Sequence, residues 1–389
     1  MNRRIWKALG IAVCMLALAA PYAMAETITH MVTADTDFAK VVKNINASGV
    51  DDENVIELCA DITLTGNHTL KRSTTIKSKD EDRKISINGS NAGITVTGEG
   101  TVLNLGAKGY DKKLTIEGDG DARIQAAFVT VSEGATANMY EHVTLQNWTS
   151  AGNACVVIKG SKSVTGSKPV FNMHGGVIEK CSRAVMADSG ATFNMSGGEI
   201  RNCVSMNDGG GLYADNSTIN ITGGTISGCE GRWGGGLYAE NSSTITISGG
   251  AISGCEVGAG GGLFVDGSTL TIKGGTISKC ITSDTGNGGG LYAYNSIITI
   301  SGGTIKDNKA AYGGGVALID STIQEIKNWK VIGNEAYETG GIGGIGGGIK
   351  LENGSMDVSD GSNQIYNNKA DRHGADVFLY NSNASIELP

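Results

Sequence analysis

The sequence predicts an all-β fold, a parallel β-helix in which short strands stack coil upon coil. A pair made of Ile or Val and, three residues later, Cys or Asn occurs eight times, and the first residues of successive pairs lie 22, 26, 26, 25, 28, 26 and 34 positions apart. Repeats of this length bury their apolar faces only against their neighbours, as in a solenoid. The chain also has 60 Gly and only 3 Pro, which is typical of tight turns between short strands. The pairs are Ile178/Cys181, Ile200/Cys203, Ile226/Cys229, Ile252/Cys255, Ile277/Cys280, Ile305/Asn308, Val331/Asn334 and Ile365/Asn368.

Residues 1–25 predict an export signal. Three cations precede an apolar run from Ala8 to Ala20, and Ala23-Met24-Ala25 has the small-x-small pattern of a cleavage site. We therefore expect a secreted or cell-surface protein. Removal of this segment takes away three cations and no acids, so the net charge of −8 becomes −11. An acidic exported chain argues against nucleic acid as a partner, and it is compatible with Ca²⁺. No later segment approaches 18 consecutive apolar residues, so no transmembrane segment is expected.

Residues 26–50 predict an N-terminal capping segment. Phe38, Val41, Val42 and Ile45 have helical spacing within residues 34–48, with Thr36 or Asp35 as the N-cap. An amphipathic helix here would cover the open end of the first coil, which otherwise invites edge pairing. The β-helix is expected over residues 51–389, with irregular early coils and regular repeats at about 176–381. Strands are predicted in the early coils at Val55–Leu58, Ile62–Leu64, Thr74–Ile76, Ile85–Ile87, Ile94–Val96, Val102–Leu105, Leu114–Ile116, Val129–Val131 and Val143–Leu145.

One regular coil can be interpreted residue by residue. Alternation places Leu237 and Ala239 inward and Tyr238 and Glu240 outward, and Asn241 makes the turn. Two further strands, around Ile245 and Ile252, complete a coil of three strands that ends at Cys255. Coils that stack about 4.8 Å apart, roughly thirteen in number, would form a rod about 60 Å long.

The repeats resemble those of polymorphic outer-membrane proteins and related autotransporter passengers. That family alternates a Gly-Gly-apolar motif with an apolar-x-x-Asn motif, and the second occurs here at Ile305–Asn308 and Ile365–Asn368. The resemblance implies a right-handed, pectate-lyase-like β-helix and a surface-displayed, adhesin-like protein. In five repeats Cys replaces Asn. The first motif occurs at Gly210-Gly211-Leu212, Gly235-Gly236-Leu237, Gly261-Gly262-Leu263, Gly289-Gly290-Leu291, Gly314-Gly315-Val316 and Gly347-Gly348-Ile349.

The Cys and Asn residues of the pairs predict a structural ladder along one corner of the coils. Free Cys behaves as a small apolar residue, so a row of buried thiols is the first interpretation. A disulfide between neighbouring coils and a metal site are the alternatives. With Cys59 and Cys155 the exported chain has seven cysteines, so at least one stays unpaired within a monomer.

An outward-facing row of aromatic and acidic residues is the candidate binding site. The residue after each Gly-Gly-Leu points outward, and a carboxylate follows two positions later in three coils. Aromatic rings beside carboxylates suit a long polysaccharide, because sugar faces pack on rings and acids accept hydrogen bonds from hydroxyls. The alternative is cross-strand stacking without any ligand. The candidate ligand-binding residues are Tyr213, Tyr238, Phe264, Tyr292, Asp215, Glu240 and Asp266.

The same carboxylates leave an enzyme as an alternative. Asp215, Glu240 and Asp266 lie close enough to divide acid and base roles, or to share Ca²⁺. The local signatures of pectin-degrading β-helices are absent: there is no Asn-Thr-Asp, no Gly-His-Gly and no Arg-x-Pro-x-x-Arg. Residues 117–121 form an acidic turn that is a weaker candidate for Ca²⁺, and the insertion at 335–346 is a candidate edge loop for a protein partner.

The sequence thus favours an exported, non-catalytic, adhesin-like scaffold without a cofactor. Its partner would be a polysaccharide or a host or cell-surface protein. A carbohydrate-active lyase or hydrolase on the same face, and a passive structural component of the envelope, are the alternatives. The oligomeric state is left open.

Overall fold

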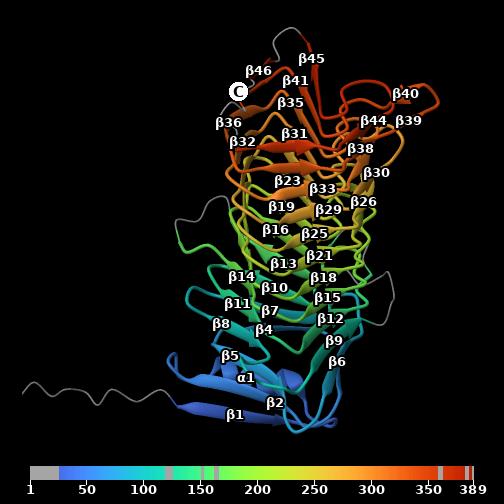
Figure 1. Cartoon of the computed structure of the whole chain (residues 1–389). Helices are drawn as coiled ribbons and strands as arrows, with labels where there is room; N and C mark the ends of the chain where they lie inside the picture. Colours follow the sequence, from blue (N-terminus) through green and yellow to red (C-terminus); the bar gives the residue numbers. More distant parts are fainter. Residues whose placement is uncertain are drawn as a thin grey trace, which may run out of the picture.

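The computed structural model describes residues 26–118, 126–149, 153–161, 166–357, 362–381 and 385–387. Over these residues the chain winds into a right-handed parallel β-helix of about 13 turns with a single helix near its N-terminal end (Figure 1). The predicted all-β fold class is confirmed. The predicted export signal lies outside the described residues.

Three parallel sheets of twelve strands each form the sides of the stack. Sheet A contains β1 (Thr27–Val32), β2 (Glu53–Leu58), β5 (Thr74–Ser78), β8 (Val102–Leu105), β11 (Thr136–Met139), β14 (Val170–Met173), β17 (Thr192–Met195), β20 (Thr218–Ile221), β24 (Thr244–Ile247), β28 (Thr269–Ile272), β32 (Ile297–Ile300) and β36 (Thr322–Ile326). Sheet B contains β3 (Ile62–Leu64), β6 (Arg83–Ile87), β9 (Leu114–Gly118), β12 (Val143–Gln146), β15 (Val177–Glu179), β18 (Glu199–Arg201), β21 (Thr225–Ser227), β25 (Ala251–Ser253), β29 (Thr276–Ser278), β33 (Thr304–Lys306), β37 (Lys330–Ile332) and β43 (Gln364–Tyr366). Sheet C contains β4 (Asn67–Leu70), β7 (Gly93–Thr97), β10 (Val129–Ser132), β13 (Val156–Lys159), β16 (Val185–Asp188), β19 (Leu212–Asp215), β23 (Leu237–Glu240), β27 (Leu263–Asp266), β31 (Leu291–Tyr294), β35 (Val316–Ile319), β41 (Ile349–Glu352) and β45 (Val377–Tyr380).

A fourth parallel sheet, which we call the corner sheet, runs between sheets B and C in the later coils. The expectation of three strands per coil is therefore wrong for these coils. The short corner strands are mostly polar or small and show little alternation, so they resemble loops in the sequence. The corner sheet contains β22 (Glu230–Trp233), β26 (Glu256–Ala259), β30 (Ile281–Thr282), β34 (Lys309–Ala310), β38 (Glu335–Ala336) and β44 (Lys369–Ala370).

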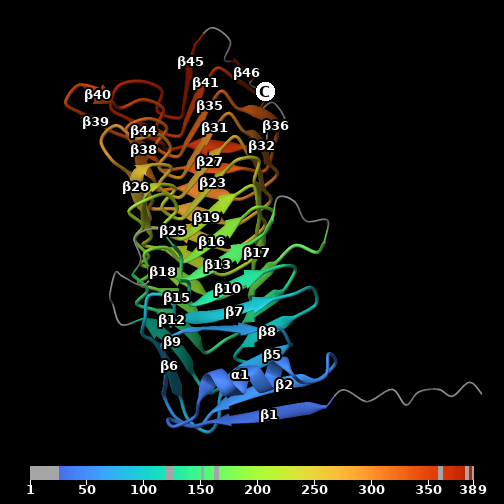
Figure 2. The ribbon, with the colours of Figure 1, turned by 180° about the vertical axis from the view of Figure 1, so that it is seen from behind.

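Two small strand pairs stand apart from these sheets. In the predicted edge loop, β39 (Glu338–Thr339) and β40 (Ile342–Gly343) pair in antiparallel fashion, and this hairpin projects from the stack (Figures 1 and 2). Strands β42 (Ser355–Asp357) and β46 (Ser385–Glu387) pair in parallel.

The N-terminal end is closed by helix α1 (Phe38–Asn46), as Figure 2 shows. Phe38, Val42 and Ile45 are buried, and they join the core of the first coils. The N-cap is Asp37, whose carboxylate accepts the backbone N–H of Lys40, and not Asp35 or Thr36 as the sequence suggested. The Thr36 hydroxyl instead accepts the backbone N–H of Thr33 and closes the preceding turn. Ahead of the helix, β1 pairs with β2, so part of the predicted capping segment already belongs to sheet A.

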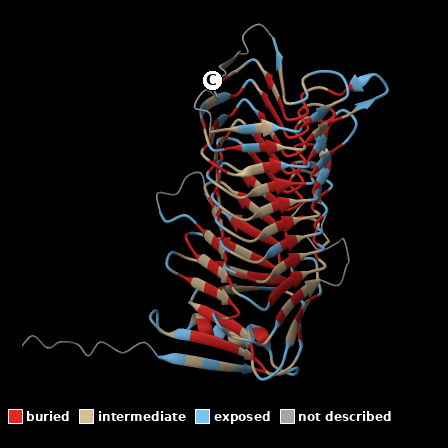
Figure 3. Cartoon of the chain, in the orientation of Figure 1, coloured by how far each residue is buried: buried red, intermediate tan, exposed pale blue. Residues whose placement is uncertain are grey.

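A continuous hydrophobic core runs through the interior of the stack (Figure 3), and a small second cluster contains Ala127, Ala154 and Val157. In the coil interpreted above, Leu237, Ala239 and Ile245 are fully buried, as alternation predicted. Asn241 has φ +56, in the left-handed region that Asn tolerates better than most residues, and it makes the turn after β23.

The Gly-Gly-Leu motif follows from the close approach of neighbouring coils. A Cβ at Gly236 would lie 2.6 Å from the carbonyl oxygen of Gly262, and one at Gly262 would lie 2.6 Å from that of Gly290. A Cβ does not fit at such a distance from a backbone oxygen. The second glycine of each motif therefore allows the backbones of two neighbouring coils to approach each other closely.

Candidate binding groove

The four predicted aromatic residues form a continuous row on the outer face of sheet C, which we call the aromatic row. Tyr213, Tyr238, Phe264 and Tyr292 are aligned by the parallel register of β19, β23, β27 and β31. Successive ring centroids lie 5.9, 5.1 and 4.5 Å apart, and the rings of Phe264 and Tyr292 are stacked. The rings therefore pack mainly on one another.

The two central rings are covered rather than open to solvent. Tyr238 is only 6% exposed and Phe264 only 7%, although both point outward from the coil. The expectation that all four rings offer their faces to a sugar is thus wrong for these two. Their faces contact neighbouring rings, and the corner sheet adds Trp233, whose ring meets Phe264 edge-on at 5.8 Å. The stacking alternative accounts for the centre of the row.

Glu240 joins two coils through tyrosine hydroxyls. Its Oε1 accepts from the Tyr213 hydroxyl at 2.5 Å, and its Oε2 accepts from the Tyr238 hydroxyl at 3.0 Å. Burial, together with the adjacent Glu240 carboxylate, raises the pKa of both phenols well above the ordinary value. Both oxygens of Glu240 therefore have a structural role.

The other two predicted carboxylates differ from each other. Asp215 accepts from the amide of Asn241 at 2.9 Å, which ties the turn after β23 to the coil below. Asp266 has no hydrogen-bond donor within the described part of the chain. Desolvation, with a smaller contribution from Glu240, raises the pKa of Asp266 above its ordinary value. Of the three, Asp266 is the carboxylate that remains available to a ligand.

A groove of about 580 Å³ runs between the aromatic row and the corner sheet. Phe264, Tyr292 and Asp266 line it from sheet C, and Trp233 lines it from β22. The Arg232 guanidinium lies over the Trp233 ring, 5.6 Å from its centroid. The complete lining is Arg232, Trp233, Tyr238, Gly258, Ala259, Phe264, Asp266, Ser283, Thr285, Gly286, Asn287 and Tyr292.

Sequence reasoning missed several residues at or beside this groove. Trp233, Arg232 and Asn287 belong to the corner segments, which carry no strand signal in the sequence. Arg183 was missed as well: its guanidinium lies over the Tyr213 ring at 4.6 Å and donates to the carbonyl oxygen of Asp208 at 2.6 Å. The one signal in the sequence was Trp233 itself, a large aromatic residue in an otherwise Gly-rich repeat.

The Cys and Asn ladder lies inside the coils, at the corner that follows sheet B. The cysteines of the described residues are all free thiols, and the five in the ladder are buried. Burial raises the pKa of Cys181 well above its ordinary value, so this thiol is neutral at physiological pH. The amide of Asn308 donates to Asn334 at 2.9 Å, the amide of Asn334 donates to Asn368 at 3.0 Å, and Asn368 donates to the Asp376 carboxylate at 2.9 Å.

A second row of asparagines lies outside the coils, on sheet A, and sequence reasoning missed it. The row begins at Thr75, which accepts from the amide of Asn104. Each later amide donates to the preceding asparagine at 2.8 Å. The row contains Asn104, Asn138, Asn172, Asn194 and Asn220.

The candidates for Ca²⁺ are the carboxylates of sheet C and the acidic turn at residues 117–121. Among the described residues, no three His, Cys, Asp or Glu side chains converge as metal ligands. In the acidic turn, Glu117 forms an ion pair with Lys84 at 3.0 Å, and residues 119–121 lie outside the described part. In that same described part, no helix has the length and apolar character needed to cross a membrane.

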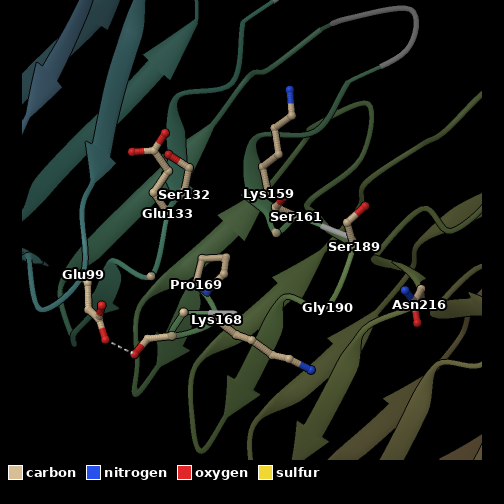
Figure 4. Close-up of a pocket in the computed structure, with 14 residues that line it drawn as sticks. Glu99, Ser132, Glu133, Lys159, Ser161, Lys168, Pro169, Ser189, Gly190 and Asn216 are labelled. Carbon is tan, nitrogen blue, oxygen red and sulfur yellow. Dashed lines mark hydrogen bonds between the residues drawn. The ribbon is translucent and has the colours of Figure 1, made fainter. Parts of the chain in front are cut away.

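A separate hollow of about 630 Å³ lies away from the predicted residues, beside the turns that follow β7, β10, β13 and β16 (Figure 4). Its acids already have partners: Glu99 accepts from Ser167 at 2.5 Å, and Glu133 accepts from Thr97 at 2.9 Å. Lys159 and Lys168 also line it, and their side chains point in different directions. We favour the groove as the candidate site, because it combines aromatic surface with an unpaired carboxylate.

The regular coils match one known family. Residues 189–388 match a family model described as right handed beta helix region. No curated protein and no solved structure matches the chain. The matched range includes the four strands that carry the aromatic row and the corner strands that face it.

Proposed function

Because the chain belongs to the right-handed β-helix family, we propose that this protein is an exported, non-catalytic scaffold that binds carbohydrate in the groove between the aromatic row and the corner sheet. The family is compatible both with surface adhesins and with carbohydrate-active enzymes. The export signal in residues 1–25 supports a secreted or cell-surface location, and the likeness to polymorphic outer-membrane repeats supports an adhesin-like role.

The groove itself carries this proposal. Carbohydrate sites combine an aromatic surface, on which the C–H face of a sugar packs, with acceptors for its hydroxyls. The groove offers the half-buried rings of Trp233 and Tyr292 together with the unpaired carboxylate of Asp266. Its length along several coils suits an extended chain better than a compact metabolite.

The state of Glu240 supports binding rather than catalysis. Glycoside hydrolysis normally needs two carboxyl groups on opposite sides of the scissile bond. Glu240 uses both of its oxygens on tyrosine hydroxyls, and Asp215 accepts from Asn241. Asp266 is thereby left without an obvious second carboxylate.

One observation favours the enzyme alternative. The raised pKa of Asp266, caused first by desolvation, is the property that a general acid needs. A lyase or hydrolase with Asp266 as its acid therefore remains the second candidate function.

A retention assay with residues 26–389 tests the proposal. The protein is passed over immobilised neutral, amino and uronic acid polysaccharides, and the eluate is assayed for newly formed chain ends. Retention without new ends supports the proposal, and new ends that disappear in Asp266→Asn support the enzyme. If the protein shows neither retention nor cleavage, both candidate functions are contradicted, and a passive envelope component or a protein partner is left. For a protein partner, the β39–β40 hairpin is the first surface to delete.

Matched variants locate the binding. We expect Trp233→Ala to weaken retention at least tenfold, because the ring forms a wall of the groove and lies on the corner sheet rather than in the core. Tyr366→Ala is the control, since Tyr366 is an exposed aromatic residue on sheet B. Equal retention by the two variants would contradict the assignment to the groove.

A further inference from the structure

We infer that the binding surface continues from the groove onto a row of exposed tyrosines, and that its ligand class is a straight, ribbon-like β-linked polysaccharide rather than a coiled α-linked one. This inference rests on the proposed carbohydrate-binding function and names the substrate class for the same site. It follows from the alignment of two exposed tyrosine rings beside the groove.

These tyrosines belong to a second row on the outer face of sheet C, which we call the tyrosine strip. It lies two residues further along the strands than the aromatic row. The parallel pairing of β27, β31, β35, β41 and β45 aligns its members without a shift in register. Its first member, Asp266, also lines the groove, so the strip and the groove form one continuous surface. The strip contains Asp266, Tyr294, Ile319, Glu352 and Tyr380.

Both tyrosines of the strip are open to solvent, unlike the centre of the aromatic row. Tyr294 is 40% exposed and Tyr380 is 56% exposed. Among the described residues, no ring or cation lies against the Tyr294 ring and its hydroxyl has no hydrogen-bond partner. Because the C–H face of a sugar packs on an open aromatic ring, each tyrosine offers a surface for one sugar unit.

The charges of the strip favour a neutral ligand. Glu352 forms an ion pair with Lys350 at 2.8 Å, so these two side chains balance each other. In the groove the charges of Asp266 and Arg232 are also balanced. Asp266 has no donor within the described part of the chain and can accept hydrogen bonds from sugar hydroxyls.

The spacing of the two rings favours a straight ligand. Tyr294 and Tyr380 lie three strands apart in sheet C, which corresponds to about 14 Å. Equivalent positions of strands paired in register point out of the same face, so both rings project to the same side. A β-1,4-linked glucan is an extended ribbon and can pack on both rings at once, whereas an α-1,4-linked glucan coils and turns away after one ring.

The test compares cellohexaose with maltohexaose by calorimetry with residues 26–389. The two ligands have the same sugar, length and absence of charge, and they differ only in the linkage. We expect cellohexaose to bind about tenfold more tightly, because it gains the contact with a second ring. Cellobiose is too short to reach both rings, so it and maltose should bind with affinities within about threefold of each other.

Variants of single tyrosines then assign the preference to the strip. Tyr294→Ala should reduce the preference for cellohexaose to within about threefold, and Tyr294→Phe, which keeps the ring, should retain it. Tyr294 is not part of the hydrophobic core, so the alanine variant should fold. Tyr366→Ala removes an exposed tyrosine of sheet B and is the matched control, which should keep the full preference.

The failure of this inference and the failure of the proposed function give different results. Equal affinity for the two hexaoses, or a preference that persists in Tyr294→Ala, would overturn the inference and leave the carbohydrate-binding function intact. So would the absence of binding to both hexaoses in a protein that is retained on another polysaccharide. The absence of retention on every polysaccharide would overturn both, and the tyrosine strip would then be a candidate contact for a protein partner.

Discussion

Replacement of Asn334 by alanine should strongly destabilise the later coils. Asn334 is fully buried and forms four side-chain hydrogen bonds. Its Oδ1 accepts from the backbone N–H and the side-chain amide of Asn308, at 3.0 and 2.9 Å. Its amide donates to the carbonyl oxygen of Ile305 at 3.1 Å and to Asn368 at 3.0 Å. Alanine removes all four bonds.

The magnitude follows from the groups left without partners. Two buried donors, the backbone N–H of Asn308 and one N–H of its side chain, lose their acceptor. Each unsatisfied buried group costs about 1–3 kcal/mol, so we expect a loss of about 4 kcal/mol in the free energy of unfolding. That loss is a large fraction of the stability of an ordinary domain.

Cysteine at the same position should be better tolerated than alanine. Five coils carry Cys in place of Asn, and the Cys280 thiol interacts with Cys255 and with its backbone N–H, contacts that lower the pKa of Cys280. A thiol at position 334 can therefore partly replace the lost acceptor. We expect Asn334→Cys to lose only about half as much free energy as Asn334→Ala.

Urea unfolding of residues 26–389, followed by the fluorescence of tryptophan, measures these differences. Trp329 is fully buried and directly precedes β37, the strand that Asn334 follows, so it reports on the affected coil. Because repeat arrays can unfold in parts, hydrogen exchange should locate the loss in the coils around residue 334. Equal losses for the alanine and cysteine variants, or a loss below about 1 kcal/mol for alanine, would refute the reasoning.

Three further predictions use other features of the stack. Gly262→Ala should lose about 2–3 kcal/mol, because its Cβ would lie 2.6 Å from the carbonyl oxygen of Gly290, whereas Gly66→Ala, with open space around it, should have little effect in the same urea assay. In residues 26–389 a thiol reagent should modify the half-buried Cys59 quickly and the buried cysteines only after unfolding; rapid modification of Cys229 would contradict the burial of the ladder. Burial raises the pKa of Tyr292 to about 12, against about 10 in the unfolded chain. The Tyr292 phenol therefore stays protonated to a higher pH in the native state, and the free energy of unfolding should fall as pH rises from about 10 to about 12. Tyr292→Phe should reduce that fall, which the pH dependence of the urea midpoint measures.

The sequence was sufficient to predict the features that repeat with a fixed period. Leu237, Ala239 and Ile245 are buried as alternation requires, and Asn241 makes a turn in the left-handed region. The alignment of the aromatic row also follows from the repeats, because equivalent residues in a parallel stack lie directly above one another.

The missed features depend on contacts that no local pattern encodes. The corner strand Glu230–Trp233 has no apolar alternation, so its pairing with β26 comes from the stacked coils and not from its own preference. The covering of Phe264 by Trp233 depends on that strand. The outer asparagine row spans early coils of unequal length, so amides that pair at 2.8 Å are separated by 34 residues at one step and 22 at another.

The aromatic row has a translational symmetry that is broken at both ends. The same position carries Met186 in the coil before Tyr213 and Ala317 in the coil after Tyr292, so neither neighbour extends the rings. Four rings at the spacing of parallel strands span about 15 Å, the length of about three sugar units. A much longer stack of coils thus contains one ring stack of fixed and finite size, and its length is set by the residues at a single position of each repeat.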